Sequence, residues 1–465
     1  MKKNLFISFM LLVSACMFGQ DITGDWNGVL KVQGMQLRLM FHVTKTNDGY
    51  SATMDSPDQG AKGIPMTKAT FENQVLTIEM AAAKIEYSGK LDSGFVSGTF
   101  KQGGMSIPLK LTRQATEKVE VKRPQNPVKP YPYYSEEVTF VNTKDNISLA
   151  GTLTLPKKEG KYPVVVLITG SGPQNRDEEL MGHKPFLVLS DYLTRNGIGV
   201  LRYDDRGCFA SKGDFKTATT NDFATDVLAA VGYLKTRKDI DLKHIGLIGH
   251  SEGGIIAPMV ATSTSDVNFI VLMAGTGVSG GDILLKQQED IGRTNGTDEA
   301  NLQLTKDINK GVYQKISLIT DTAKLRSELI SYLKSRMKDI PAKDIPQNIK
   351  EEDLLNAQMS AIMNPWMLNF IRYNPAPVLE KVKCAVLALN GDKDLQVCSK
   401  VNLPAIENAL KKGGNKKYTI KELAGLNHLF QECKTGAPSE YAAIEQTISP
   451  IALETMANWI KTVVR

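Results

Sequence analysis

The sequence predicts an α/β domain whose largely parallel sheet carries a helical insertion, preceded by a small all-β domain that forms a barrel or a sandwich. Three observations support this fold class. The apolar run from Val164 to Ile168 has the composition of a strand buried on both faces. The segment from Ile245 to Val260 runs from a strand pattern through a glycine-rich turn into helical spacing. Short strand-like runs with turn signals between them fill residues 21–113.

Residues 1–20 have the features of a secretory signal peptide. Two lysines precede an apolar stretch, Leu5 to Met17, that is too short to span a bilayer. Val13 to Cys16 also forms an acceptable lipobox, so a lipid anchor on Cys16 is the alternative. A lipid anchor is normally followed by a polar spacer, whereas here the next domain begins at once. We therefore expect an exported protein, periplasmic or secreted, with no lipid anchor and no membrane span.

Residues 21–113 are expected to form the accessory β domain. Strand-like runs such as Gln36 to Val43 and Val75 to Met80 are separated by turn signals such as Asn47-Asp48-Gly49. The region contains no combination of residues that indicates chemistry. We expect a β domain with a packed core, which docks on the α/β domain or sets the oligomeric state. A homodimer is one such state. An apolar ligand inside the barrel is the alternative.

A linker over residues 114–134 is expected to separate the two domains, because its four prolines prevent regular structure and favour an extended, semi-rigid spacer. The α/β domain then covers residues 135–465. Its expected elements, besides those around the glycine-rich turn, are the strands Glu137 to Asn142, Ser148 to Leu155, Ile198 to Tyr203 and Phe269 to Ala274, and the helix Asp222 to Leu234.

The glycine-rich turn contains the pattern G-x-S-x-G, with Gly249, Ser251 and Gly253 at its defined positions. A nucleophilic serine must project from a sharp turn between a strand and a helix, and side chains at the two glycines would crowd those elements. The backbone amide of Glu252 then lies at the helix N-terminus, where an oxyanion would form. The turn therefore predicts Ser251 as a nucleophile; the alternative is an ordinary glycine-rich turn.

An acid and a histidine follow Ser251 in the order that such a serine requires. Asp394 follows a strand-like run, Val386 to Asn390, and His428 follows another, Tyr418 to Leu423. The 34 residues from Asp394 to His428 fit one strand–helix–strand step. The 143 residues before Asp394 are too many for one step and indicate an insertion. We assign His428 as general base and acid, and Asp394 as the group that orients it.

Both partners have competitors. Asp392 is the alternative acid, but the loop must extend beyond the strand end to reach the histidine, which favours Asp394. The chain has five histidines: His42, His183, His244, His250 and His428. His42 lies in the all-β region, and His244 is expected at the far end of the strand before Ser251. His250 is expected to pack against the turn or support it, and His183 is the main competitor of His428.

The loop Thr169-Gly170-Ser171-Gly172-Pro173 follows the strand that ends at Ile168. A loop after an early central strand can present a backbone N–H beside the nucleophile, so we expect Ser171 or Gly172 to complete the oxyanion hole with Glu252. A plain Gly/Pro turn is the alternative. The polar residues from Gln174 to Asp177 then either line the rim of the pocket or hold a turn together.

Polar helices are expected at about residues 280–374, which is the insertion that the Ser251–Asp394 separation requires. A helical insertion beside an active site can cover it, exclude water and shape specificity. One segment of it groups methionines and aromatic residues: Met359, Met363, Trp366, Met367 and Phe370. These side chains belong either to a core or to the wall of a pocket that would favour an apolar acyl or aryl group.

Residues from about 135 to 465 resemble the α/β-hydrolase-fold serine hydrolases, and more narrowly bacterial two-domain esterases of the serine-aminopeptidase-like or prolyl-peptidase-like group. The matching segments are TGSGPQNRD (169–177), RYDDRG (202–207), GHSEGG (249–254), NPAPVLEKVKCAVLALNGDKDLQV (374–397) and GLNHLFQ (425–431). The resemblance implies an α/β-hydrolase fold with a cap and a Ser–Asp–His triad that acts on esters. Cys208-Phe209-Ala210-Ser211 departs from the small residues usual after RYDDRG, so pocket shape does not carry over.

The expected function is that of a carboxylesterase acting on a small-molecule ester with a small or medium acyl group. A peptidase or amidase with the same triad is the alternative, as is a non-catalytic binding protein on this scaffold. No cofactor or metal is implied, since zinc-type clusters are absent from the sequence. The net charge is +6, or +4 without the two lysines of the signal peptide, which is too small to indicate nucleic-acid binding. A disulfide between Cys398 and Cys433 is left open, with free thiols preferred.

Overall fold

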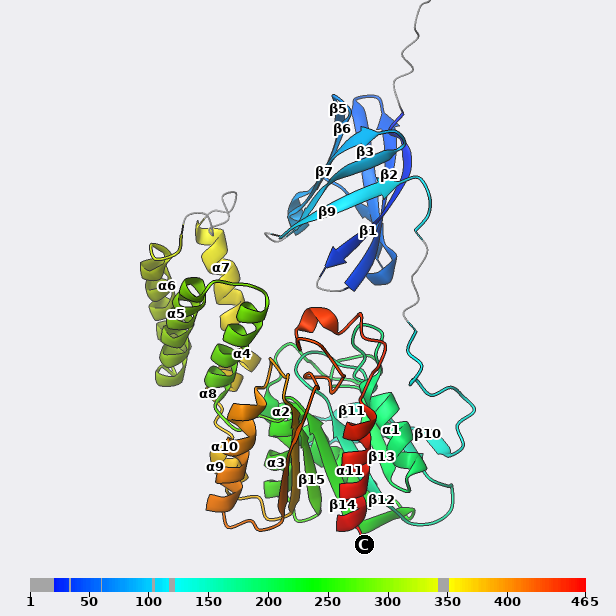
Figure 1. The fold of residues 1–465 in the computed structure, drawn as a ribbon, viewed down its shortest axis with the longest axis vertical. Coiled ribbons are helices and arrows are strands. Elements are labelled where there is room, and N and C mark those ends of the chain that lie inside the picture. The colour runs from blue at the N-terminus through cyan, green and yellow to red at the C-terminus, as the bar shows by residue number, and fades with distance from the viewer. Residues whose placement is uncertain (1–20, 33–34, 60, 103–104, 117–121, 342–350) are drawn as a thin grey trace, which may run out of the picture. The chain divides into compact units, whose positions relative to one another are not determined.

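The computed structural model describes residues 21–32, 35–59, 61–102, 105–116, 122–341 and 351–465 (Figure 1). The expected signal peptide, with Cys16, lies outside these residues. The chain forms two compact units that divide between residues 119 and 120. Within the described ranges, every helix is too short or too polar to cross a bilayer.

The first unit is a closed antiparallel β-barrel, which decides between the two predicted architectures (Figure 1). Its strands are β1 (Gly24–Val32), β2 (Met35–Thr46), β3 (Gly49–Ser56), β4 (Ala61–Pro65), β5 (Lys68–Glu72), β6 (Val75–Met80), β7 (Ile85–Asp92), β8 (Phe95–Gln102) and β9 (Met105–Thr112). Their order is β2-β1-β9-β8-β7-β6-β5-β3-β4, and a pairing of β2 with β3 closes the barrel. Short 3-10 helices follow β3 and β6, at Pro57–Gln59 and Ala81–Ala83.

Large side chains fill the barrel interior. Trp26, Phe41, Tyr87 and Phe100 are almost completely buried, and the rings of Phe41 and Tyr87 stack with their centroids 5.8 Å apart. The Tyr87 hydroxyl is satisfied inside this core because it donates to the backbone oxygens of Val96 and Leu109. The alternation of inward apolar and outward polar residues therefore produces a packed core, as the sequence favoured.

The second unit contains an eight-stranded sheet in the order β10-β11-β13-β12-β14-β15-β16-β17. The strands are β10 (Tyr134–Asn142), β11 (Ile147–Leu155), β12 (Tyr162–Ile168), β13 (Gly199–Tyr203), β14 (Ile240–His250), β15 (Phe269–Met273), β16 (Ala385–Gly391) and β17 (Tyr418–Leu423). β10, β11 and β13 pair antiparallel, and from β13 to β17 all pairs are parallel. This order, with β12 between β13 and β14, confirms the predicted α/β-hydrolase sheet.

Helices cover both faces of this sheet, and each face has its own apolar core (Figure 1). α2 (Thr220–Lys235), α3 (Gly253–Ser263), α9 (Ala376–Leu379) and α10 (Ser399–Lys412) pack on one face. α1 (Pro185–Arg195) and α11 (Pro450–Val463) pack on the other. The buried strands are rich in β-branched residues because they contact helices on both sides. The carboxyl ends of the parallel strands therefore meet at one edge, where ligands of such sheets bind.

The insertion between β15 and β16 is helical, as the sequence predicted (Figure 1). It contains α4 (Gly280–Thr294), α5 (Glu299–Leu318), α6 (Thr322–Met337), α7 (Glu351–Ile362) and α8 (Pro365–Arg372). Its helices have their own small core, which includes Val312, Ile316, Leu325 and Leu329. Asp298 and Asp321 cap α5 and α6 by accepting hydrogen bonds from backbone amides in the first turn.

Part of the predicted linker is held on the second unit. The Arg123 guanidinium donates to the backbone oxygens of Ala442 and Ile444 at 2.8 and 2.7 Å. Gln125 donates to the oxygen of Ile448 at 2.7 Å and accepts from its amide at 3.1 Å. The proline pattern indicated only an extended spacer, because these partners lie more than 300 residues away in the sequence.

After β17 the chain forms the loop that carries His428, a short 3-10 helix, Pro438–Glu440, and finally α11. This loop lies at the carboxyl edge of the sheet, together with the loops that follow β12, β14 and β16. The predicted triad and oxyanion residues therefore belong to loops at one edge, and Gly249 and Gly253 lie at the adjoining ends of β14 and α3.

Candidate active site

Ser251 occupies a strained turn between β14 and α3. Its φ is +52°, which lies in the left-handed region that side chains other than glycine rarely adopt. The strain is held in place because the Ser251 amide donates to the backbone oxygen of Met273 on β15 at 2.8 Å. A serine kept in such a conformation by the surrounding structure is typical of a functional position.

The two glycines of the motif allow close backbone contacts. A Cβ atom on Gly249 would lie 1.9 Å from the oxygen of Gly253. A Cβ atom on Gly253 would lie 2.2 Å from the oxygen of Ile168 at the end of β12. The turn is thus tight against both its own helix and the neighbouring strand, as the pattern predicted.

Asp394 and His428 form a buried pair. The Nδ1 atom of His428 lies 2.8 Å from Oδ2 of Asp394, and the two side chains are 5% and 0% exposed. The other oxygen, Oδ1, accepts the backbone amides of Gln396 and Val397, each at 2.8 Å. Nδ1 therefore carries the proton, and Nε2 is left as the acceptor.

Asp392, the alternative acid, has a different partner. Its Oδ1 accepts the backbone amide of Gly425 at 2.7 Å, and its side chain is exposed. The structure therefore brings Asp394, and not Asp392, to His428. The loop extends beyond the end of β16 at Gly391 to reach the histidine, as predicted.

A cavity of about 250 Å³ connects the predicted residues. Ser251 and His428 both line it, as do Ser171 and Glu252 of the predicted oxyanion hole. Gly172 lies beside a second, much smaller cavity that also borders Gly170 and Glu252. The structure thus brings the serine, the histidine and two of the three oxyanion candidates to one cavity, with Gly172 next to it.

The loop after β12 is held in place by a buried carboxyl group. Asp205 accepts the hydroxyl of Thr169 at 2.7 Å and the amide of Gln174 at 2.9 Å, so it spans the oxyanion loop. Burial raises the pKa of Asp205 to about 8, with nearby Glu178 and Glu252 adding to the rise. This role was not predicted, although Asp205 belongs to the RYDDRG segment.

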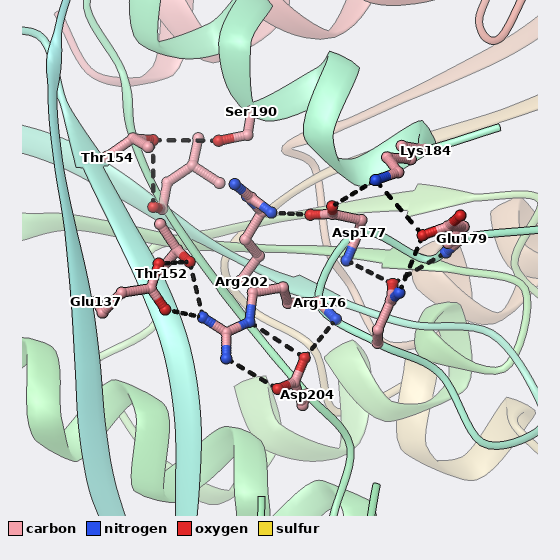
Figure 2. A network of polar contacts seen from close by, with 12 residues as sticks. Glu137, Thr152, Thr154, Arg176, Asp177, Glu179, Lys184, Ser190, Arg202 and Asp204 are labelled. Atoms are coloured by element: carbon pink, nitrogen blue, oxygen red, sulfur yellow. Dashed lines mark hydrogen bonds and ion pairs between the residues drawn. The ribbon is translucent and has the colours of Figure 1, made fainter. Parts of the chain in front are cut away.

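Charged residues hold the next part of the same loop (Figure 2). The Arg176 guanidinium donates to both oxygens of Asp204, at 2.8 and 3.1 Å, and also contacts Glu137. Arg202, almost completely buried in β13, pairs with Asp177. The polar run from Gln174 to Asp177 therefore binds the loop to β10 and β13, which was one of the two predicted roles.

The side chain of Glu252 connects the insertion to the elbow. Its Oε1 accepts the indole N–H of Trp366 on α8 at 2.8 Å and the hydroxyl of Thr220 on α2 at 2.7 Å. Desolvation raises the pKa of this buried carboxyl group. The sequence predicted a role only for the backbone amide of Glu252, because the partners of its side chain lie on two helices that are distant in sequence.

The group of methionine and aromatic residues divides between the two predicted roles. Met359 is buried in the core of the insertion, and Met363 and Met367 pack against that core. Trp366 and Phe370 instead line the cavity, with their rings stacked at 5.1 Å and 18°. The insertion therefore covers the cavity with an aromatic wall and acts as a cap.

The remaining histidines have structural partners. His183 contacts the hydroxyl of Thr447 and the oxygen of Tyr441, at 3.0 and 2.9 Å, and burial lowers its pKa to about 4. His42 pairs with Asp25 and Asp55, and His244 pairs with Asp241. His250, which was expected to pack against the turn or support it, has ring atoms that contact Glu178 and the backbone of His428, on the loops after β12 and β17.

The structure describes four cysteines, Cys208, Cys384, Cys398 and Cys433, and all are free thiols. The Cys398–Cys433 disulfide that the sequence left open is therefore not formed. No group of three or more His, Cys, Asp or Glu side chains suited to a metal ion occurs within the described ranges.

Comparison with known proteins identifies the family. A sequence model of the X-Pro dipeptidyl-peptidase (S15) family matches residues 145–405, which include Ser251 and Asp394. Esterase EstD of Thermotoga maritima is 34% identical over 288 residues, which are 59% of this chain and 64% of the esterase. An acyl transferase of Photorhabdus luminescens is 30% identical over 126 residues, 27% of this chain and 37% of the transferase. The chain thus spans less than two thirds of the length of either relative.

Solved structures with similar chain traces are remote in sequence. An esterase of Pyrococcus furiosus, Pf2001, is 15% identical; the match covers 74% of this chain and 97% of the esterase, with a TM-score of 0.41. The hypothetical protein PA2218 of Pseudomonas aeruginosa is also 15% identical, covering 75% of this chain and 99% of that protein, with a TM-score of 0.43.

Proposed function

The chain belongs to the X-Pro dipeptidyl-peptidase (S15) family, and within it we propose that this protein is a serine hydrolase that cleaves carboxylic esters with small or medium acyl groups. The observation that carries the proposal is the buried Asp394–His428 pair, whose histidine lines the same cavity as the strained Ser251. Esterase EstD, at 34% identity, supports the same reaction class.

In the proposed mechanism, Oγ of Ser251 attacks the ester carbonyl and Nε2 of His428 takes its proton. Backbone amides of Ser171 or Gly172 and of Glu252 stabilise the oxyanion. His428 then gives the proton to the departing alcohol, which leaves an acyl group on Ser251. Water, deprotonated by His428, hydrolyses this acyl-enzyme and restores the serine. Asp394 keeps the imidazole in the required tautomer and stabilises its charged form.

The charges around the cavity favour a neutral substrate. Its acidic lining residues, Glu178 and Glu252, both accept hydrogen bonds from protein donors. A dipeptidyl peptidase must bind the ammonium group of a free N-terminus, which requires an acceptor that faces the substrate. In each carboxylate Oε1 already accepts from two protein donors, which reduces its capacity to accept from an ammonium group, so we propose an ester without a positive charge.

The cap supports an apolar or aromatic acyl group. The stacked rings of Trp366 and Phe370, together with Ile283 and Leu284, form one wall of the cavity. Aromatic rings offer large apolar contact surfaces to a flat or aliphatic group. A cavity of about 250 Å³ suits a small or medium group. We therefore propose aryl and short aliphatic acyl esters as the preferred substrates.

Peptide hydrolysis is the second candidate, because the matching family is described as X-Pro dipeptidyl-peptidases. The same triad attacks esters and amides, so the two activities differ only in how the cavity holds the leaving group and the acyl side. A direct comparison of substrates separates them.

The experiment compares a series of p-nitrophenyl esters, from acetate to octanoate and benzoate, with aminoacyl and Xaa-Pro p-nitroanilides. Ser251→Ala should abolish ester hydrolysis, while Ser263→Ala, at the far end of α3, should not. Ester turnover without anilide turnover supports the proposal, and faster anilide turnover moves the assignment to peptidase. Activity that survives in Ser251→Ala, or no activity in either protein, contradicts the proposed mechanism; the second result favours a binding protein.

A further inference from the structure

A second histidine, His250, lies next to the proposed catalytic His428. The rings of His250 and His428 have centroids 4.8 Å apart, and His250 is buried. Its Nε2 lies 3.0 Å from the backbone oxygen of His428. A carbonyl oxygen only accepts hydrogen bonds, so Nε2 of His250 must carry a proton.

The other ring nitrogen of His250 also needs a proton. Nδ1 lies 2.9 Å from Oε1 of Glu178, whose side chain is only 7% exposed. The same oxygen accepts the backbone amide of Gly170 at 2.8 Å. An oxygen that accepts from two donors is best served by an ionised carboxylate, which leaves the proton on Nδ1. The pair is therefore an imidazolium with a buried carboxylate as its counterion.

The electrostatic balance agrees with this assignment. Burial opposes the charged form of His250, but the carboxylate of Glu178 outweighs it, so the pKa of His250 is raised above its ordinary value. Asp394 contributes in the same direction from the loop after β16. The other titratable groups nearby are His428, through its ring and backbone, and Asp205, which interacts electrostatically with Glu178.

The contacts of this pair join two loops that are far apart in sequence. Glu178 and Gly170 belong to the oxyanion loop after β12, and His428 belongs to the loop after β17. Glu178 has a φ of +50°, and Phe430, whose ring lies against His250, has a φ of +60°. Two non-glycine residues thus keep strained backbones where the two loops meet at His250, which indicates a positional requirement.

We propose that Glu178 and protonated His250 are positioning residues that fix the oxyanion loop relative to the general base His428. This inference rests on the proposed function, because it gives the pair a role in that reaction. Through Gly170, the carboxylate sets the loop that carries Ser171; through Nε2–H, the imidazolium sets the backbone of His428. If His250 is neutral, its single proton cannot serve both acceptors, and one of the two loops loses its contact.

The substitution Glu178→Gln tests this role. The replacing amide can offer its oxygen to Gly170, but it no longer stabilises the charge on His250. The ring is then neutral at alkaline pH and satisfies only one of its two acceptors, whereas at acidic pH the imidazolium restores both contacts. We expect kcat/KM to fall by about 10- to 100-fold near pH 8, mainly in kcat. Without the carboxylate, burial lowers the pKa of His250, so the ratio of variant to wild type should recover only well below the ordinary imidazole pKa, near pH 5. Glu179→Gln, at an adjacent residue whose contacts are on the surface, is the matched control and should follow the wild type at both pH values.

A loss in Glu178→Gln that is equal at all pH values, or no loss, overturns the positioning role. A second measurement needs no folded variant at Glu178: ¹⁵N NMR of histidine-labelled wild-type protein, with His250 assigned by elimination. We expect protons on both ring nitrogens of His250 near pH 7.5, and a ring with one proton overturns the inference. The NMR measurement does not depend on turnover. An absence of ester hydrolysis would therefore contradict the proposed function but would leave the measured protonation of His250 unchanged.

Discussion

The role of Asp394 allows a prediction whose direction follows from three hydrogen bonds. Oδ1 accepts the amides of Gln396 and Val397, and Oδ2 accepts Nδ1–H of His428. In Asp394→Asn the two backbone donors require the amide oxygen to take the place of Oδ1. The amide nitrogen must then face His428 and donate to Nδ1, so the imidazole changes to the tautomer with its proton on Nε2. That tautomer cannot accept the proton of Ser251.

The expected loss is large for a nearly isosteric change. The same tautomer error in a serine protease triad lowers kcat by about 10⁴-fold, and we expect a similar factor here, which corresponds to about 5 kcal/mol of transition-state stabilisation. The fold should be retained, since each backbone donor keeps its acceptor. The assay is kcat and KM on the best p-nitrophenyl ester, with circular dichroism as the check on folding.

Asp392→Asn is the matched control, two residues away. Asp392 accepts only the Gly425 amide, and its side chain is exposed, so its kcat should stay within about threefold of the wild type. A folded Asp394→Asn protein that keeps more than a tenth of wild-type kcat would refute the reasoning. So would an equal loss in Asp392→Asn.

Three further predictions concern the cap, the effect of pH on stability and export. Trp366→Phe keeps the aromatic wall but removes a hydrogen bond to the buried Glu252 carboxyl group, so the free energy of unfolding in urea should fall by about 1.5–3 kcal/mol; an unchanged midpoint would contradict this. Burial lowers the pKa of His183 in the folded protein to about 4, below its value of about 6.5 in the unfolded chain. The neutral ring therefore contributes about 3 kcal/mol to the free energy of unfolding above about pH 6.5, and this contribution is lost as the pH falls toward 4. His183→Gln should flatten that part of the stability–pH curve, and an unchanged slope would argue against it. We also propose that residues 1–20 direct export, so N-terminal sequencing of protein from the natural host should begin near residue 20; an intact Met1 would contradict this.

Much of the site could be predicted because its residues act through local geometry. Gly249 and Gly253 border Ser251 in the sequence, and the close contacts that exclude side chains there are a property of any strand–turn–helix of this kind. Asp394 and His428 each follow a buried strand, and the carboxyl ends of parallel strands meet at one edge. The pattern of apolar runs is therefore enough to bring these residues together.

The residues that the sequence did not indicate depend on contacts across the fold. Glu178 lies 72 residues before His250, and their pairing requires a left-handed backbone at a glutamate, which no local pattern indicates. The side chain of Glu252 meets Trp366, 114 residues away on the cap. Arg123 is held by backbone oxygens, which have no sequence signature. Such contacts become visible only when the loops are placed in space.

The central claim is that Ser251 is a nucleophile activated by His428. The most direct test is reaction of the purified protein with a fluorophosphonate, followed by intact mass measurement and peptide mapping. We expect one adduct per chain, located on Ser251, and its formation should be at least about 100-fold slower in His428→Gln. No adduct, or an adduct on another residue that persists in Ser251→Ala, would contradict the account.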